Sequence, residues 1–461
     1  MLSTPAKLGT IILLTVVVRL VFCLAVYPAL SHVPFLQGHD RYEDIARNLL
    51  SGSGYSMDPN GPPTIKRLPL YPIVIYLTYA SMGIHLLAVR LVHVLLAAVT
   101  AWLIFLIGEA LFSETVGLLA AAFFSIHPHL IQYTARPYTE TLYIFLTCLF
   151  AYLLLDTPGS APRRGGLIAG GIFGLMSLTK GVAIGFPALF FLGCLLDPSH
   201  RRSLTPLGRY LFFFLIGAAI IVSPWAYRNY ALTGKLILRS TFEGGPLYQG
   251  FYTASHLGDG WPVGELDRAA SAERSRIVHE RLGPVRGPIG EYEADRLAYS
   301  LWFRNVLGNP HRAATLFLRN LFRVWYIGRS TLGTYLTLLL HLPLVGLSAF
   351  GLVWLARNDR KSLSMAWPIC SLIIYFNVIY AAAYPIVRFI LPVVPFVMIL
   401  AGFGLVKILG LAVPSRSIEP ESVARETSTG PVLTPCHRRA EGRLQSPVNL
   451  ERPEPLSECR S

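Results

Sequence analysis

Long apolar runs alternate with short charged connectors along most of the chain. The first run, residues 8–30, contains a single charged residue, Arg19. A helix needs about 20 apolar residues to cross the hydrocarbon core of a bilayer, so this run is predicted to span a membrane. The run is longer than the apolar core of a signal peptide, and no small-residue cleavage site follows it. We therefore expect it to be retained as the first helix.

The same pattern predicts about ten membrane-spanning helices. The fifth and sixth are the shortest, and they could also form one broken pair around Lys180. The predicted spans are 8–30, 86–108, 116–131, 139–155, 166–179, 182–196, 210–224, 333–356, 363–383 and 389–412.

Arginine and lysine in the connectors predict how these helices are oriented. The connectors 161–166, 199–209 and 357–361 are basic and fall on the same side as the start of the chain. Short cytoplasmic loops carry an excess of these residues, so this side is predicted to be cytoplasmic. The outward segments are then a charged first loop, about 31–85, and a larger loop between spans seven and eight, about 225–332. The predicted fold is an all-α polytopic membrane protein.

The pattern changes at the end of the last span. Residues 413–461 contain no aromatic residue and are rich in Pro, Ser, Glu and Arg. A segment of this composition has too little apolar surface to form a core, so we expect a disordered cytoplasmic tail. The rest of the chain, residues 1–412, is predicted to form one transmembrane domain.

The composition agrees with a membrane protein and excludes several other classes. The chain of 461 residues is 53% hydrophobic and only 14% charged, whereas soluble domains are about a quarter charged. The net charge of +14 is the kind of excess that basic cytoplasmic loops produce, so no nucleic-acid partner is predicted. The six cysteines form no CxxC pair, which argues against a disulfide framework or a zinc site. No metal or cofactor is predicted.

The first outward loop contains a charged stretch that is predicted to form a helix over residues 40–50. Its apolar positions fall on one face and its charged positions on another, as in an amphipathic helix that lies on the outer membrane surface. Glycines 52 and 54 are predicted to end it. The apolar positions are Tyr42, Ile45, Ala46 and Leu49, and the charged ones are Asp40, Asp44 and Arg47.

The carboxylates of this helix allow two interpretations. Glu43, Asp44 and Arg47 could simply form its solvated face. Asp40 stands at the start of the helix, where an aspartate often serves as an N-cap. At the same position it could also be a carboxylate held at the mouth of the helix bundle, and the residues alone do not decide between the two.

Two adjacent cations, Lys66 and Arg67, precede an apolar run that contains prolines. A pair of cations opposite a carboxylate suits an anionic headgroup, such as a phosphate, beside a general base. The alternative is that both side chains only extend toward the membrane interface.

Further charged residues are predicted at the outer ends of the spans. An unpaired ammonium between two apolar segments, as at Lys180, is costly and is usually functional. A single arginine at a span end usually only extends to the interface, but several that converge on one face of the membrane indicate a site. These residues are His127, Arg136, Glu140, Lys180, Arg228 and Arg388.

The order of short motifs along residues 8–412 resembles the GT-C glycosyltransferases. The likeness is to the bacterial branch related to protein O-mannosyltransferases and to the lipid A aminoarabinose transferase. The motifs are D-x-Y-x-x-I-A-x-N-L-x-x-G-x-G at 40–54, R-x-P-L-Y-P at 67–72, HP at 127–128, TETLY at 139–143, SLTKG at 177–181, PWAYRNY at 224–230 and R-F-x-x-P-x-x-P at 388–395.

This resemblance implies an inverting glycosyltransferase in a bacterial inner membrane. The donor would be a sugar linked to polyprenyl phosphate, and an acceptor hydroxyl (protein, lipid or glycan) would be modified on the periplasmic face. Asp40 matches the aspartate that serves as general base, and Arg67 matches a basic residue near the donor phosphate, where we also expect Lys66 and Arg388. Related sequences often have an acidic residue at the position of Lys66. The other site candidates are Tyr42, Glu43, Asp44, Arg136, Glu140, Lys180 and Arg228.

A transporter or flippase of an anionic lipid is the alternative from another class. It would use the same cations to accompany its substrate. The sequence contains no visible repeat and no inverted pair of halves, which many transporters have. The charged helix after the first span and the large outer loop also favour an enzyme.

Overall fold

In the computed structural model, residues 3–30, 40–157, 161–196, 204–257 and 263–411 are described. Their regular secondary structure is helical, apart from one isolated β-bridge between Ser56 and Pro63. The predicted all-α class is confirmed. The predicted tail, 413–461, and residues 31–39 of the predicted first loop lie outside the described residues.

Each of the predicted spans contains a helix in the structure. The first begins as α1 (Thr4–Val21), continues as one π-helical stretch, η1 (Phe22–Val26), and ends as α2 (Tyr27–Leu30). The third is bent by 59° between α6 (Glu114–Ile126) and α7 (Pro128–Thr134). The remaining spans correspond to α5 (Leu86–Leu111), α8 (Glu140–Leu154), α9 (Pro162–Ser177), η3 and α10 (Gly181–Gly185, Phe186–Leu196), α11 (Leu204–Thr233), α16 (Thr331–Asn358), α18 (Trp367–Ala383), and α19, η5 and α20 (Val387–Ile390, Leu391–Val393, Val394–Ile408).

Five helical segments among the described residues are long and apolar enough to cross a membrane, or six if the bent pair α6–α7 counts as one span. They are Thr4–Leu30, Leu86–Leu111, Leu204–Thr233, Thr331–Asn358 and Val387–Ile408. Helices α8 and α18, and η3 with α10, are apolar but shorter. The polytopic membrane class therefore stands, whereas the number of ten spans stays a prediction.

The first outer loop contains two helices. The predicted helix is present as α3 (Tyr42–Leu50), and α4 (Leu70–Met82) follows it. The apolar face of α3 is buried and packs against α4, so this face contacts the protein and is not left for the membrane surface. The N-cap of α3 is Arg41, whose φ of 61° lies in the left-handed region, and no side chain caps the helix. The capping alternative for Asp40 was therefore wrong.

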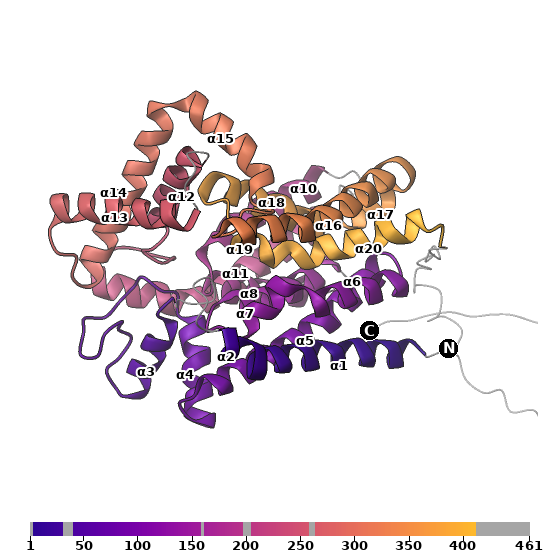
Figure 1. Cartoon of the computed structure of the whole chain (residues 1–461), viewed down its shortest axis with the longest axis horizontal. Helices are drawn as coiled ribbons and strands as arrows, with labels where there is room; N and C mark the ends of the chain where they lie inside the picture. The colour runs from indigo at the N-terminus through magenta and orange to yellow at the C-terminus, as the bar shows by residue number, and fades with distance from the viewer. Residues whose placement is uncertain (1–2, 31–39, 158–160, 197–203, 258–262, 412–461) are drawn as a thin grey trace, which may run out of the picture. The chain divides into compact units, whose positions relative to one another are not determined.

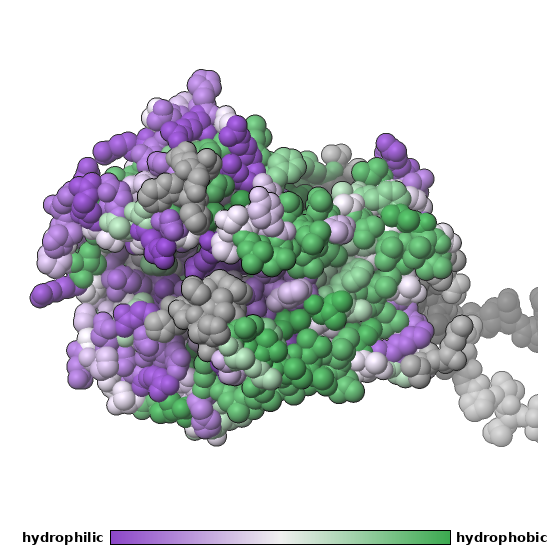
Figure 2. All heavy atoms as spheres, in the orientation of Figure 1, coloured by the Kyte–Doolittle hydropathy of each residue, from purple (hydrophilic) through white to green (hydrophobic). Residues whose placement is uncertain are grey.

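The larger outer loop is a helical layer of its own. It contains α12 (Gly244–His256), α13 (Val263–Leu282), α14 (Gly287–Gly308) and α15 (Pro310–Arg323). The short helix α17 (Arg360–Met365) lies in a different connector, between α16 and α18. Figure 1 shows α12–α15 at the same end of the long helices as α3. In Figure 2 hydrophilic residues gather over this end, while a hydrophobic surface covers the helices beyond it. The two predicted outer loops thus lie at one polar end.

Glycines allow α9 and α11 to pack with their backbones in close contact. Gly166 and Gly170 lie on one face of α9, because residues four apart in a helix share a face. A Cβ atom added at Gly170 would lie 2.0 Å from the backbone oxygen of Phe214, and one at Gly166 would lie 2.3 Å from that of Tyr210. Small residues at such spacing are typical of close helix pairs in membranes.

The single methyl group of an alanine should separate these two helices. Gly170→Ala should cost about 1–3 kcal/mol through overpacking and lower the thermal midpoint of the protein in detergent. Gly171→Ala is the matched control, because nothing lies within 4 Å of a Cβ atom added there. It should be neutral or slightly stabilising, since alanine is the better helix former. Equal midpoints for the two variants would contradict the close packing.

Candidate active site

Four charged residues from distant parts of the chain form one network, called the charge cluster below: Asp40, Glu140, Lys180 and Arg388. Arg388 donates from Nη2 to Asp40 Oδ2 and from Nε to Glu140 Oε1, both at 2.5 Å. Lys180 Nζ lies 3.1 Å from the same Glu140 oxygen. The cluster contains two carboxylates and two cations, so its formal charge is zero.

Burial explains why these residues are paired. The side chain of Glu140, in the first turn of α8, is not exposed at all, and those of Lys180 and Arg388 are each 13% exposed. A charge removed from water is tolerated only with partners of opposite charge. Lys180 lies in the break between α9 and η3, and Arg388 in the four-residue helix α19. Asp40, just before α3, is the most accessible member, with a side chain that is 26% exposed.

Aromatic rings surround the cations of the cluster. The guanidinium of Arg388 lies 4.3 Å from the ring centre of Tyr138, and Lys180 Nζ lies 5.4 Å from that of Tyr143. Contacts of this kind stabilise cations electrostatically and restrict their position. Tyr138 was not predicted from the sequence, although it stands between two residues that were, Arg136 and Glu140.

Arg67 lies close enough to the cluster for its charge to act on Asp40. Its guanidinium lies 5.2 Å from the ring centre of Tyr42 and 4.4 Å from that of Phe242, and it forms no ion pair with a described residue. Burial alone would raise the pKa of Asp40, but the charges of Arg388 and Arg67 outweigh it and lower that pKa below its ordinary value. Asp40 is therefore an ionised carboxylate at neutral pH, next to one cation that is not neutralised.

The neighbouring cation, Lys66, extends to another part of the molecule. Its Nζ lies 4.0 Å from Glu291 Oε1 on α14. Glu291 also accepts hydrogen bonds from Thr64 Oγ1 and from the backbone N–H of Ile65, both at 2.8 Å. The structure thus separates the two cations that the sequence had grouped, with Arg67 near the cluster and Lys66 at the outer helical layer.

Three candidates on α3 do not join the charge cluster through a direct bond. Tyr42 is buried, which raises its pKa to about 12, and its ring packs edge-on against Tyr71. Glu43 pairs with Arg47 at 2.7 Å, and Asp44 pairs with Arg41 at 2.8 Å. These two ion pairs connect side chains of the same helical segment.

Arg136 and Arg228 both lie against aromatic rings. Arg136 lies 4.6 Å from the ring centre of Tyr138, the same ring that faces Arg388. Arg228 lies against Tyr55 and Trp225 and donates to the backbone oxygen of Thr64 at 3.2 Å. Arg136 thus adjoins the cluster through one ring, whereas Arg228 supports the segment that leads to Lys66 and Arg67.

His127 belongs to a separate group of buried histidines. Its Nε2 lies 3.2 Å from Nε2 of His341 on α16, and its ring is also close to that of His129. Within the described residues, no group of three or more His, Cys, Asp or Glu side chains is arranged to hold a metal ion.

Glu243, which the sequence analysis did not single out, connects the outer layer to the cluster. A Cβ atom added at Gly181, next to Lys180, would lie 2.0 Å from Glu243 Oε1. The other carboxylate oxygen of Glu243, Oε2, forms an ion pair with Arg239 at 2.8 Å. Burial raises the pKa of Glu243 to about 7, and it raises that of the nearby Asp295 to about 6. No motif indicated Glu243, because its position depends on how α12 packs.

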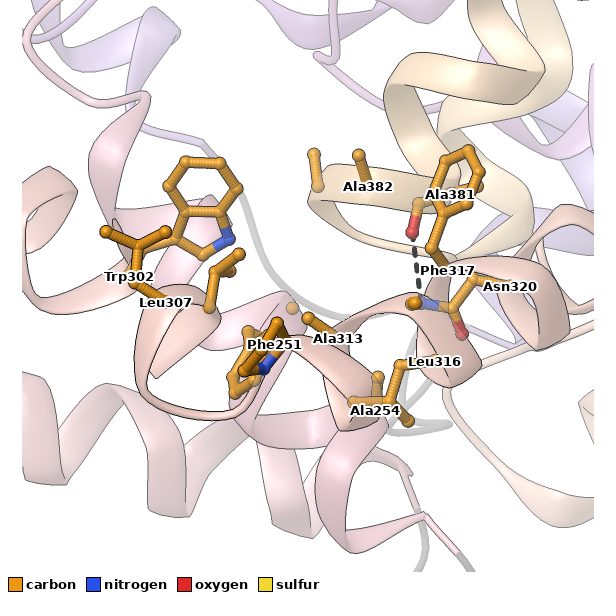
Figure 3. Close-up of a pocket in the computed structure, with 15 residues that line it drawn as sticks. Phe251, Ala254, Trp302, Leu307, Ala313, Leu316, Phe317, Asn320, Ala381 and Ala382 are labelled. Atoms are coloured by element: carbon orange, nitrogen blue, oxygen red, sulfur yellow. Dashed lines mark hydrogen bonds between the residues drawn. The ribbon is translucent and has the colours of Figure 1, made fainter. Parts of the chain in front are cut away.

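The outer layer also contains an apolar pocket of about 330 Å³, shown in Figure 3. Trp302 and Leu307 of α14 face Ala381 and Ala382 of α18 across it, and residues of α12 and α15 complete the wall. Asn320 donates to the backbone oxygen of Ala381 at 3.0 Å. This lining suits hydrocarbon, not a sugar or a phosphate.

Comparisons with known proteins agree with the arrangement of the helices. Residues 63–227 match the family model described as dolichyl-phosphate-mannose-protein mannosyltransferase. The structure also resembles the oligosaccharyltransferase AglB from Archaeoglobus fulgidus. The TM-score is 0.56 for AglB tethered with an acceptor peptide, at 14% identity, over 88% of this chain and 50% of that one. The chain has the GT-C glycosyltransferase fold.

A second AglB structure gives a similar result. AglB in complex with an inhibitory peptide and a dolichol-phosphate matches with a TM-score of 0.53 at 14% identity, over 87% of this chain and 50% of that one. The chain thus spans about half of the length of AglB. ArnT from Cupriavidus metallidurans overlaps less well, with a TM-score of 0.39 at 15% identity, over 82% of this chain and 77% of that one. No protein of curated function matches by sequence.

The buried carboxyl of Glu243 should make this GT-C fold less stable as the pH rises. Its pKa of about 7 lies above its ordinary value of 4.5, so the folded state binds the proton more tightly than the unfolded state. The stabilisation is present below pH 4.5 and is lost as the pH rises to about 7, by an amount on the order of 3 kcal/mol. The pKa of Asp295 is also raised, so this carboxyl likewise makes the folded state less stable as the pH rises.

Thermal midpoints measured between pH 5 and 8 would test this. The midpoint of the parent protein should fall with pH, and Glu243→Gln should reduce that fall, because glutamine cannot ionise. Glu293→Gln is the control, since Glu293 is an exposed residue of α14. A Glu243→Gln protein with the full pH dependence would exclude Glu243 as its source.

Proposed function

We propose that the chain is an inverting glycosyltransferase, with residues 1–412 as its transferase domain. It moves a sugar from a polyprenyl-phosphate-linked donor to an acceptor hydroxyl. The observation that carries this proposal is the pairing of an ionised, partly exposed Asp40 with Arg388, beside Arg67. The family description matched by residues 63–227 and the dolichol-phosphate bound to AglB support a lipid phosphate as carrier.

Charge balance supports a phosphate beside Arg67. The charge cluster is neutral by itself, and Arg67 adds one positive charge. A sugar on a lipid phosphate is a phosphodiester with one negative charge, so the donor would neutralise this site. Two N–H groups of Arg388 hold Asp40 and Glu140, and a guanidinium has five. The remaining groups can donate to phosphate oxygens.

The proposed transfer proceeds as a single displacement. The acceptor oxygen forms a bond to the anomeric carbon of the sugar, and the bond from that carbon to the phosphate oxygen breaks. The electron pair of the broken bond goes to the phosphate, and the hydroxyl proton goes to Asp40. The leaving lipid phosphate then carries more negative charge than the donor did. Arg67 and Arg388 stabilise this additional charge, which is how fixed cations accelerate phosphate departure.

Asp40→Asn tests the role of the base. It keeps the size of the side chain and removes its ability to accept the proton, so the transfer rate should fall by about 10²–10⁴-fold. The measurement is the release of free polyprenyl phosphate from labelled polyprenyl-phosphate sugars by the purified protein. A transporter would release none from any variant.

Asp44→Asn is the matched control for this substitution. It makes the same chemical change four residues away, at a carboxylate that pairs with Arg41 on the same segment. Its release rate should stay close to that of the parent. Thermal midpoints of both variants show whether either has lost its fold. A folded Asp40→Asn protein with normal release would refute the proposed base.

We also propose that the charge cluster faces the periplasm of a bacterial inner membrane. The basic connectors support this orientation, because the loop 357–361 would be cytoplasmic and α12–α15 would be outside. Single cysteines at Ser300 and Lys361, both exposed, should react differently with an impermeant thiol reagent added to intact cells lacking the native cysteines. Labelling at position 300 only is expected, and labelling at 361 only would reverse the orientation.

A further inference from the structure

A second cavity, here called the polar cavity, lies beside Lys66, the residue before Arg67. It has a volume of about 300 Å³ and lies between α13, α14 and the segments that contain Lys66 and Phe242. The side chains that bear on its chemistry are Lys66, Thr241, Arg274, Ser275, His279 and Asp295. Its wall therefore differs from the apolar wall of the pocket in Figure 3.

The unused polar groups of this cavity are mainly hydrogen-bond donors. Thr241 is only 5% exposed, and among the described residues neither its Oγ1 nor the buried Nε of Arg274 has a hydrogen-bond partner. Buried polar groups are nearly always hydrogen-bonded, so groups without a partner that line a cavity indicate a ligand. Lys66 adds a second cation at the rim: its 4.0 Å contact with Glu291 is an ion pair but is too long for a hydrogen bond, so its N–H groups make no short bond to that carboxylate.

The carboxylates in the wall are already occupied. Glu291 accepts from Thr64 and from the backbone of Ile65, and Asp295 Oδ1 accepts from the backbone N–H of Gly244 at 2.8 Å. The cavity can thus still offer the N–H groups of two cations and two hydroxyl groups, while the oxygens of its carboxylates already accept hydrogen bonds from the protein. A ligand that fits has acceptor oxygens and a negative charge.

Position relates this cavity to the charge cluster. Phe242 lines the cavity, and the guanidinium of Arg67 lies 4.4 Å from the centre of its ring. Lys66 and Arg67 are consecutive in the sequence. Lys66 lines the cavity, and Arg67 lies near Asp40. The cavity and Arg67 thus share one side chain, that of Phe242.

We propose that the polar cavity binds the acceptor substrate, through a carboxylate or phosphate on a saccharide. Lys66 and Arg274 hold the anionic group, and Thr241 and Ser275 bind sugar hydroxyls. This rests on the proposed transferase function and deepens it, because it assigns the acceptor to the class of anionic glycans. It also gives Lys66 a role that is separate from the donor phosphate.

The test is direct binding of small probes to the full-length protein in nanodiscs, which needs no turnover. Glucuronate, glucose 6-phosphate and inorganic phosphate are titrated and compared with neutral glucose, with the thermal midpoint as readout. Glucuronate or glucose 6-phosphate should raise the midpoint at lower concentrations than glucose. The first two probes distinguish a carboxylate from a phosphate, and inorganic phosphate shows whether the sugar contributes.

Charge-removing variants assign this binding to the cavity. Arg274→Gln and Lys66→Gln should each weaken it about ten- to a hundredfold, as expected for one lost charge-assisted contact. Arg276→Gln is the matched control, because Arg276 lies on the same helix, is 59% exposed and pairs with Glu273 and Glu280. It should bind like the parent protein. Lys66 is 38% exposed at the rim, so its variant is informative even if Arg274→Gln does not fold.

Each outcome has a defined meaning. Binding that survives in both Arg274→Gln and Lys66→Gln, or that is equal for glucose and glucuronate, would overturn the proposal, as would the absence of a shift with any probe. Asp40→Asn should bind the probes normally, because Asp40 does not line the cavity. Failure of the transferase proposal would appear as missing polyprenyl phosphate release, and failure of the acceptor site as missing probe binding.

Discussion

The ion pair between Glu140 and Arg388 is the interaction on which the rest of the site depends. Glu140 is a carboxylate with no exposure to water, and it is held by Arg388 and by Lys180. Removing one partner of a buried ion pair typically costs about 3–5 kcal/mol, because the other charge is left without compensation. The pair therefore holds α8, the break after α9 and the start of the last long helix in one arrangement. Asp40 is bound to this arrangement through Arg388.

A neutral network beside one additional cation is a suitable environment for an anionic substrate. The cluster needs no ligand to be stable, since its charges compensate one another. Arg67, in contrast, is held by aromatic rings and not by a carboxylate. Its positive charge is thus available to a phosphate, and together with Arg388 it lowers the pKa of Asp40. One side chain in this way supports both the phosphate and the base of the proposed reaction.

The outer helical layer does more than cover the membrane helices. Phe242 contacts Arg67 and also lines the polar cavity, and Glu243 lies against the backbone at Gly181, next to Lys180. The layer is therefore in contact with two neighbours of the charge cluster, Arg67 and Gly181. The layer contains a polar cavity and a separate apolar pocket. The first suits polar parts of a substrate, and the second suits hydrocarbon.

The sequence by itself determined the class of the protein and most of its helices. Apolar length is a local property, so the apolar helices and the helix at α3 could be predicted, and Lys180 could be singled out as a cation between two apolar segments. Only the tertiary structure decided the partners, because pairing depends on how distant segments pack: Arg388 meets Asp40 across 348 positions of sequence. The tertiary structure also decided that the side chains of Lys66 and Arg67 reach different places and that Asp40 does not cap α3. Both features depend on the direction of the backbone, which residue type does not specify.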